Sequence, residues 1–219
     1  MGNYRWHPDE GTRFYIVDCE DGSLVNTCET EPFFAFHYAN AFEQDGYLII
    51  DAASYPDASA IEDFYLETLR LGTQRMQTGQ LTRYAVPLQG EIVRSDPLTS
   101  ALVEFPRIHY RRCNGRPYRF VYGGNGQQPR NFIDQLVKVD VTTGNLQTWQ
   151  QPNCYPGEPV FVAAPEAAAE DDGVLLTLVL DAQQQQTSLF ILDARSFSPI
   201  AQATVPHVVP FGFHGQFFS

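Results

Sequence analysis

The chain has 219 residues and a formal net charge of −12 at pH 7, from 14 Lys and Arg against 26 Asp and Glu. A nucleic-acid partner is excluded, because phosphate neutralisation needs clustered Lys and Arg. Electrostatic docking on anionic lipid is disfavoured for the same reason. No apolar run approaches the roughly 20 residues of a transmembrane helix, and the opening residues lack the apolar core of a signal peptide.

The cysteines show neither a C-x-x-C pair nor dense spacing; they are Cys19, Cys28, Cys113 and Cys154. Reduced thiols are the expectation for such a pattern at this chain length. Together with the missing signal peptide, the thiols predict a cytoplasmic location.

Short β-branched and aromatic stretches bounded by turns dominate the sequence. In chain order they are "RFYIVD" (13–18), "YLIID" (47–51), "LVKVDV" (136–141), "VLLTLVL" (174–180) and "TSLFILD" (187–193). This pattern predicts an all-β fold.

One short helix is predicted over 57–72, with Asp57 as its cap and Gly72 as its end. Helical spacing places four apolar side chains on one face of it, namely Ile61, Phe64, Tyr65 and Leu69.

Internal repeats organise the strands. The segments 16–25, 138–147 and 191–200 each combine a strand, an Asp, a turn and a return strand. Residues 159–206 read as four consecutive strands, which is the size of one propeller blade. The repeats predict a β-propeller, as a partial ring of about four blades in a single domain over residues 1–219.

A His or Glu recurs near the same point of each predicted first strand. The strands are "PFFAFHYANAF", "ALVEFPRIHY", "GEPVFVAA" and "PFGFHGQFF", and they carry His37, Glu104, Glu158 and His214. Because the first strand of every blade lines the central axis, the repeats aim two imidazoles and two carboxylates at one axial point.

Simpler interpretations exist for each of these residues. His37 taken alone is more typical of a core histidine than of a metal ligand. Glu104 and Glu158 also fit structural ion pairs, or the paired carboxylates of a carbohydrate-active propeller. The phenylalanines beside the histidines fit ordinary core packing.

Five motifs, in family order, resemble the C-terminal portion of the carotenoid cleavage oxygenases, which include the retinal pigment epithelium isomerohydrolase. They are "ETEPFFAFHYANAFEQDG", "VEFPRIHYRRCNGRPYRFVYG", "PGEPVFVAAP", "EDDGVLLTLVLD" and "VPFGFHGQFF". The resemblance implies a seven-bladed propeller under a helical lid, with four histidines binding Fe(II) and three glutamates hydrogen-bonded to three of them.

Carried over by motif, His37 and His214 are the implied iron ligands, and Glu104 and Glu158 accept hydrogen bonds from ligand imidazoles. The other two histidines and the third glutamate are expected upstream of Met1. The family usually has Asn where this sequence has His109. On a strand its side chain would point to the face opposite Glu104, so it is expected to be peripheral.

The implied reaction is oxidative cleavage of a conjugated carbon–carbon double bond of a carotenoid or apocarotenoid by O2, giving carbonyl products. An aromatic tunnel is expected to hold the substrate, and the phenylalanines that could line it are Phe33, Phe34, Phe36, Phe211 and Phe213. The full-length protein is expected to contact a membrane peripherally.

A second hypothesis is a catalytically inactive partial propeller that serves as a binding or assembly module. Two expected iron ligands are absent from the 219 residues, and their absence favours the inactive module for the isolated chain. The open blade edges of a partial ring predict self-association.

Overall fold

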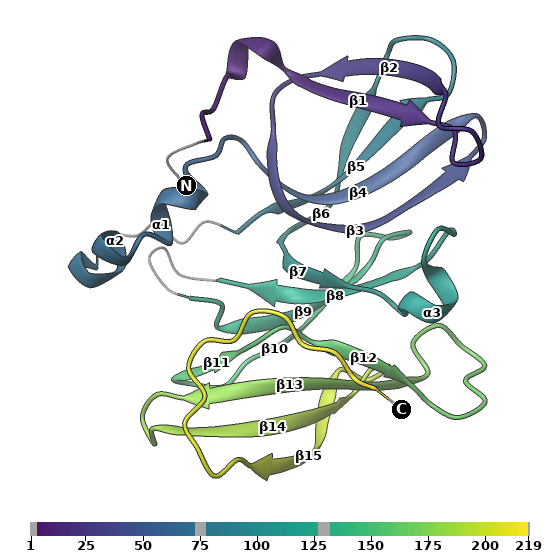
Figure 1. Ribbon diagram of the computed structural model, residues 1–219. Helices are drawn as coiled ribbons and strands as arrows, with labels where there is room; N and C mark the ends of the chain where they lie inside the picture. Colours follow the sequence, from purple (N-terminus) through teal and green to yellow (C-terminus); the bar gives the residue numbers. More distant parts are fainter. Residues whose placement is uncertain (1–3, 73–77, 127–131, 219) are drawn as a thin grey trace.

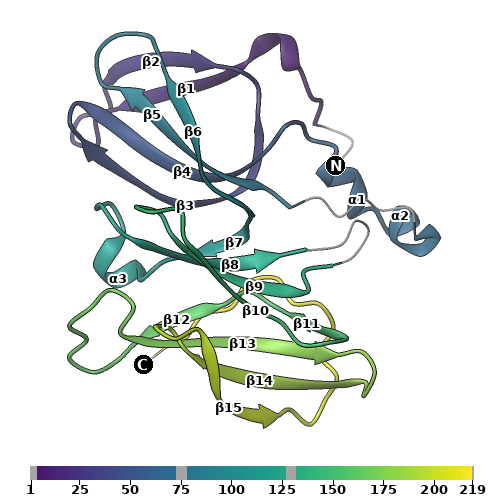
Figure 2. The same cartoon turned by 180° about the vertical axis from the view of Figure 1, so that it is seen from behind.

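The computed structural model describes residues 4–72, 78–126 and 132–218, whose strands form four antiparallel sheets arranged in chain order (Figures 1 and 2). The predicted all-β partial ring of about four blades is confirmed. Within the described residues, no helix is long and apolar enough to cross a membrane.

The first two sheets contain two and four strands. The first pairs β1 (Thr12–Val17) with β2 (Leu24–Thr30). The second follows the order β3 (Phe34–Gln44), β4 (Tyr47–Tyr55), β5 (Gln80–Pro87) and β6 (Arg94–Leu102).

The last two sheets contain four and five strands. The third consists of β7 (Glu104–Arg107), β8 (Phe120–Asn125), β9 (Gln135–Asp140) and β10 (Leu146–Trp149). The fourth consists of β11 (Cys154–Pro156), β12 (Val160–Ala163), β13 (Gly173–Asp181), β14 (Gln186–Asp193) and β15 (Ser198–Thr204). Strands β12 to β15 are the four predicted over 159–206.

Each pair of neighbouring sheets is joined by an apolar cluster. Val121 packs between the second and third sheets, whereas Tyr122, the next residue of β8, packs between the third and fourth. This alternation follows from the two-residue period of a strand. Because the inner sheets bury both faces, every residue of β9 is buried.

The three repeated Asp residues of the predicted hairpins share one backbone turn, since the carbonyl of each accepts the amide four residues on. Oδ1 of Asp18 and of Asp140 accepts the amide two residues on, from Glu20 and Thr142. Oδ1 of Asp193 accepts the amide three residues on, from Ser196. The repeats therefore mark equivalent strand–turn–strand units, which are held by side-chain oxygens.

The only lysine of the sequence, Lys138, lies buried where the third and fourth sheets meet. Its Nζ donates to Oδ2 of Asp171 at 2.9 Å and to the carbonyl of Ala194 at 2.8 Å. Nζ also lies 4.3 Å from the ring centroid of Phe120.

The predicted helix over 57–72 is instead two short helices, α1 (Ala60–Asp63) and α2 (Leu66–Leu71). The break comes at Tyr65, whose ψ of 135° is extended. Gly72 ends α2 in the left-handed conformation, as predicted. The proposed apolar face is not buried, because Phe64 and Tyr65 are exposed. The described residues also contain η1 (Pro8–Glu10) and α3 (Tyr110–Cys113).

The prediction of a strand in "PFGFHGQFF" is wrong, since residues 205–218 contain no strand. Pro206 and Pro210 remove two amide donors from this segment, and Gly212 and Gly215 weaken an extended ladder. After β15 the chain instead runs back across the fourth sheet toward β12 (Figure 1).

Candidate functional site

Two histidines from opposite ends of the chain meet in one place. His37 comes from β3 and His214 from the segment after β15, and their Nε2 atoms lie 3.1 Å apart. His37 sits at an irregularity of its strand, where the pairing between β3 and β4 shifts between Ala35 and Tyr38. A β-bulge of this kind changes the direction in which a side chain points, compared with a regular strand ladder.

Glu104 holds the other side of the His37 ring. Its Oε1 contacts Nδ1 of His37, and its Oε2 accepts a hydrogen bond from the Tyr55 hydroxyl. The amide of Phe105 donates to Oε1 at 3.2 Å. Burial, together with the nearby charge of Glu104, raises the pKa of Tyr55 well above its ordinary value, so the hydroxyl stays a donor.

Glu158 performs the same task for His214, from the short connection between β11 and β12. Its Oε1 lies 3.1 Å from Nδ1 of His214, and its Oε2 accepts the amide of Gly215 at 2.8 Å. Nε of Arg107 lies 3.1 Å from Oε1. The Glu158 side chain is only 5% exposed, so this buried carboxylate is matched by a cation and two donors.

These contacts determine which way the imidazole lone pairs point. A carboxylate only accepts hydrogen bonds, so Nδ1 of each neutral ring carries the proton. The Nε2 lone pairs of His37 and His214 then face each other, an arrangement that a cation between or beside them would stabilise. The described residues contain no group of three or more His, Cys, Asp or Glu side chains that could hold a metal ion.

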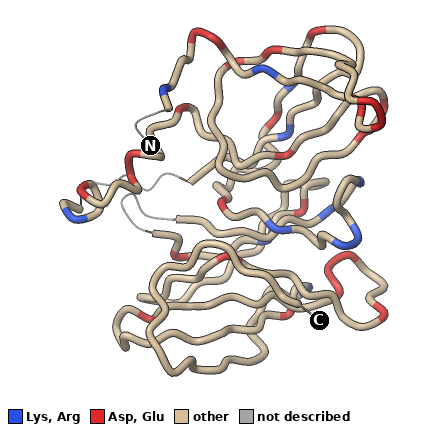
Figure 3. Tube along the Cα trace, in the orientation of Figure 1, with Lys and Arg blue, Asp and Glu red and all other residues tan. Residues whose placement is uncertain are grey.

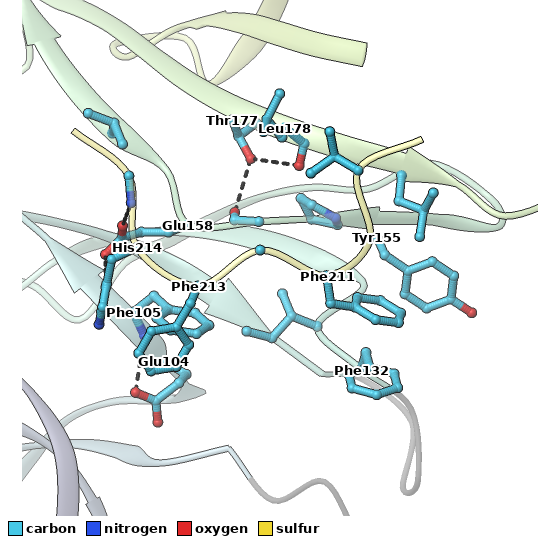
Figure 4. Close-up of a pocket in the computed structure, with 18 of the residues that line it drawn as sticks. Glu104, Phe105, Phe132, Tyr155, Glu158, Thr177, Leu178, Phe211, Phe213 and His214 are labelled. Atoms are coloured by element: carbon cyan, nitrogen blue, oxygen red, sulfur yellow. Dashed lines mark hydrogen bonds and ion pairs between the residues drawn. The ribbon is translucent and has the colours of Figure 1, made fainter. Parts of the chain in front are cut away.

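A cavity of about 750 Å³ adjoins the two histidines and both glutamates. Its walls are mostly apolar, with Phe36, Phe64, Phe105, Phe211 and Phe213 among them. Figure 4 shows Phe211 and Phe213 on the strandless C-terminal segment at this space, with Phe132 beside Phe211.

Three of the five predicted tunnel residues line the cavity, namely Phe36, Phe211 and Phe213. Phe33 and Phe34 are not among the described residues that line it. Phe33 instead stacks on Tyr84, with ring centroids 4.3 Å apart, in the core between the first and second sheets. Phe34 packs edge-on against Phe36, with ring centroids 4.7 Å apart.

Several residues of the site have no signal in the sequence. Phe105 has a φ of 51°, which is uncommon for an aromatic residue, and the pairing of β7 shifts across it. Tyr55 and Arg107 become visible only through their contacts with Glu104 and Glu158. Phe64 lines the cavity from the break between α1 and α2.

His109 is not among the described residues that line the cavity, but it does not lie on a strand as expected: it follows β7 and directly precedes α3. It is buried against Phe161 with ring centroids 4.8 Å apart, and burial lowers its pKa. His207 is exposed. The paired-carboxylate interpretation of a carbohydrate-active site finds no support, since Glu104 and Glu158 are each committed to an imidazole.

A family model described as retinal pigment epithelial membrane protein matches residues 1–219. Carotenoid isomerooxygenase of Galleria mellonella is 37% identical, covering 97% of this chain and 44% of the relative. The mitochondrial carotenoid-cleaving dioxygenase of Macaca fascicularis is 32% identical over 97% of this chain and 45% of its own length. The chain therefore spans less than half the length of these relatives.

Solved structures agree with the sequence matches. Cobalt-substituted Synechocystis ACO superposes with a TM-score of 0.84 at 30% identity, over 96% of this chain and 44% of that one. An ACO/RPE65 chimera superposes with a TM-score of 0.83 at 31% identity, over the same shares. From the match along its whole length, the chain belongs to the family of the retinal pigment epithelial membrane protein and the carotenoid oxygenases.

Proposed function

We propose that this chain forms, as one partial propeller domain, the C-terminal part of an oxygenase that cleaves a conjugated double bond of a carotenoid or apocarotenoid. Dioxygen is the co-substrate and two carbonyl compounds are the products. The observation that carries the proposal is the pair of Nε2 atoms, 3.1 Å apart, beside an apolar cavity. The names of the relatives support the reaction class.

The histidine pair fits part of a metal site. The Nε2 atoms of His37 and His214 lie 3.1 Å apart, close enough for both imidazoles to hold one ion. Imidazole is a common ligand of Fe(II), and the ion we propose is Fe(II), which when bound supplies the activation of dioxygen.

The protein's part in this chemistry is orientation. Glu104 and Glu158 keep the proton of each ring on Nδ1, so that Nε2 of His37 and His214 can act as a ligand. The Tyr55 hydroxyl holds the second oxygen of Glu104 and prevents its rotation.

The cavity is suited to a polyene. Its aromatic walls offer dispersion contacts and exclude water along a long apolar substrate. Phe105 and Phe213 pack around His37, with ring centroids 5.1 and 6.0 Å from the imidazole. A substrate in the cavity is therefore presented to the histidine pair by aromatic side chains.

An assembly module without catalytic activity is the second candidate, and two observations favour it. Among the described residues only two imidazoles converge. The ring also has open ends, because the first sheet has two strands and every residue of β15 is exposed. Self-association through these edges belongs to this second candidate.

Peripheral membrane contact of the full-length protein belongs to the first proposal, the oxygenase. The exposed side chains of Leu66 and Leu71 in α2 would supply an apolar surface for it.

The test is a titration of the purified chain with Co(II) under anaerobic conditions, followed by d–d absorbance, and then with Fe(II), followed by bound iron. Binding that disappears in His37→Ala and in His214→Ala, but persists in His207→Ala, is the expected result. His207 is the matched control because it lies seven residues before His214 and is exposed. Equal metal content in all four proteins would overturn the proposed site.

A further inference from the structure

We infer that Arg107 is a positioning residue of this site, which fastens the His214 segment to β7 and supplies the counter-charge for Glu158. The inference rests on the proposed function, since it explains how His214 is held in place. One strand, β7, then orients both histidines. Glu104 at its start contacts His37, and Arg107 at its end contacts the segment of His214.

The irregular backbone of β7 lets the side chains of Glu104 and Arg107 both reach the site. Residues 104 and 107 are an odd number of positions apart, so a regular strand would turn their side chains to opposite faces. The left-handed φ of Phe105 and the register shift between Glu104 and Arg107 break that alternation. Both side chains therefore reach the site, where they serve different histidines. Strain of this kind clusters at functional positions.

Arg107 contacts the His214 segment through two groups. One terminal nitrogen donates to the carbonyl of Gly215 and, at 3.3 Å, to Oε1 of Gln216. Its Nε lies 3.1 Å from Oε1 of Glu158, as an ion pair without the alignment of a hydrogen bond. The arginine thus touches the residue after His214 and also the carboxylate that holds the His214 ring.

The segment needs such a contact because no strand ladder holds it. Residues 205–218 contain no strand, and most of them are exposed. Upstream, Thr187 exchanges two hydrogen bonds with Val209, and Phe211 stacks on Phe132 with centroids 3.9 Å apart. Near His214 the polar contacts are those to Glu158, His37 and Arg107.

Charge points to the same conclusion. Glu158 is 5% exposed in its side chain, and an uncompensated carboxylate is costly in such a place. Arg107 is 29% exposed in its side chain and brings a permanent positive charge to it. A lysine at this position would keep the charge but not the guanidinium fork that spans Glu158 and Gly215.

The experiment compares Arg107→Gln, Arg107→Lys and the control Arg94→Gln, an exposed arginine whose contact is with Tyr47. Hydrogen exchange of residues 205–218 is measured on the metal-free chain. We expect exchange of the Gly215 amide, which donates to Glu158, to rise by about tenfold in Arg107→Gln, by less in Arg107→Lys, and not in the control. Unchanged exchange in Arg107→Gln would overturn the inference.

A second arm measures Co(II) affinity. Loss of groups that orient ligands typically weakens metal binding by about 10- to 100-fold, and we expect this range for Arg107→Gln. Faster exchange with unaltered Co(II) affinity would overturn the role of Arg107 in positioning His214 as a ligand.

If the wild-type chain bound no Co(II), the proposed function would fail, while the hydrogen-exchange measurement would still decide the role of Arg107. If Arg107→Gln unfolded, exchange would also rise in β13, and Arg107→Lys would then decide.

Discussion

The hydroxyl of Tyr55 donates to Oε2 of Glu104 while the other oxygen of the same carboxylate contacts His37. Tyr55 is the last residue of β4, and Glu104 is the first of β7. The hydrogen bond therefore ties the second sheet to the third directly behind the histidine pair. The stability of the sheet interface and the orientation of His37 depend on the same contact.

Replacing Tyr55 by Phe should destabilise the protein by about 1–3 kcal/mol, because a buried carboxylate loses a donor. Co(II) affinity should fall as well, since Glu104 can then rotate. Urea unfolding measures the first effect and Co(II) titration the second. Tyr110→Phe is the control, because Tyr110 is exposed. A variant with wild-type stability would show that the hydroxyl contributes nothing to folding.

Asp51 forms another polar link, between the second sheet and the segment that leads into β8. Its carboxylate accepts from Nε and a terminal nitrogen of Arg83 at 2.8 and 2.7 Å, and from the Tyr118 hydroxyl. Asp51→Ala should cost about 3–5 kcal/mol, because it leaves the guanidinium without its buried partner. Glu29→Gln breaks the exposed pair with Arg13 and should cost less than about 1 kcal/mol. Similar losses in urea unfolding for both variants would contradict this ranking.

Acid should destabilise the protein through Asp140. Burial alone would raise its pKa, but hydrogen bonds from Arg119 and Thr142 outweigh burial and hold the pKa well below its ordinary 3.8. The folded state therefore favours the ionised form, so this stabilisation is present above pH 3.8 and is lost as pH falls below it. In Asp140→Asn the unfolding midpoint should change less between about pH 6 and pH 3 than in the wild type. An equal acid dependence of the two midpoints would exclude this contribution.

Thiol reactivity should distinguish one cysteine from the other three. Cys19 is exposed, whereas Cys28, Cys113 and Cys154 are buried. Burial raises the pKa of Cys113 to about 11, which suppresses the reactive thiolate at neutral pH. A disulfide reagent should modify one thiol per folded chain and all four in denaturant. Cys19→Ser should abolish the fast reaction, and a fast reaction that persists would contradict the assignment.

Much of the fold could be predicted because its signals are local and repeated. The short β-branched runs of β9, β13 and β14, and the Asp turns after β1, β9 and β14, are properties of a few neighbouring residues. The helix over 57–72 was predicted less well. Its apolar residues have helical spacing, but Phe64 turns toward the cavity and Tyr65 is extended. A contact with a distant residue, Phe36, competes there with the local pattern.

The site likewise has residues that local sequence patterns predict and residues that depend on how distant parts of the chain pack. The recurrence of a His or Glu in each predicted first strand singled out His37, Glu104, Glu158 and His214, although the segment of His214 forms no strand. This recurrence could not show which glutamate serves which histidine, since that depends on how the sheets pack. Arg107 and Phe105 lay beyond prediction, because a left-handed φ within a short strand has no signal in residue type.

The buried position of Lys138 has a chemical consequence for a protein proposed to form carbonyl products. Aldehydes condense with ε-amines to give Schiff bases. The chain has one ε-amine, and it lies between two sheets, bound by Asp171 and by backbone carbonyls. While the sheets stay packed, an aldehyde leaving the cavity meets no exposed lysine on this chain, and adduct formation at Lys138 would report that the third and fourth sheets had separated.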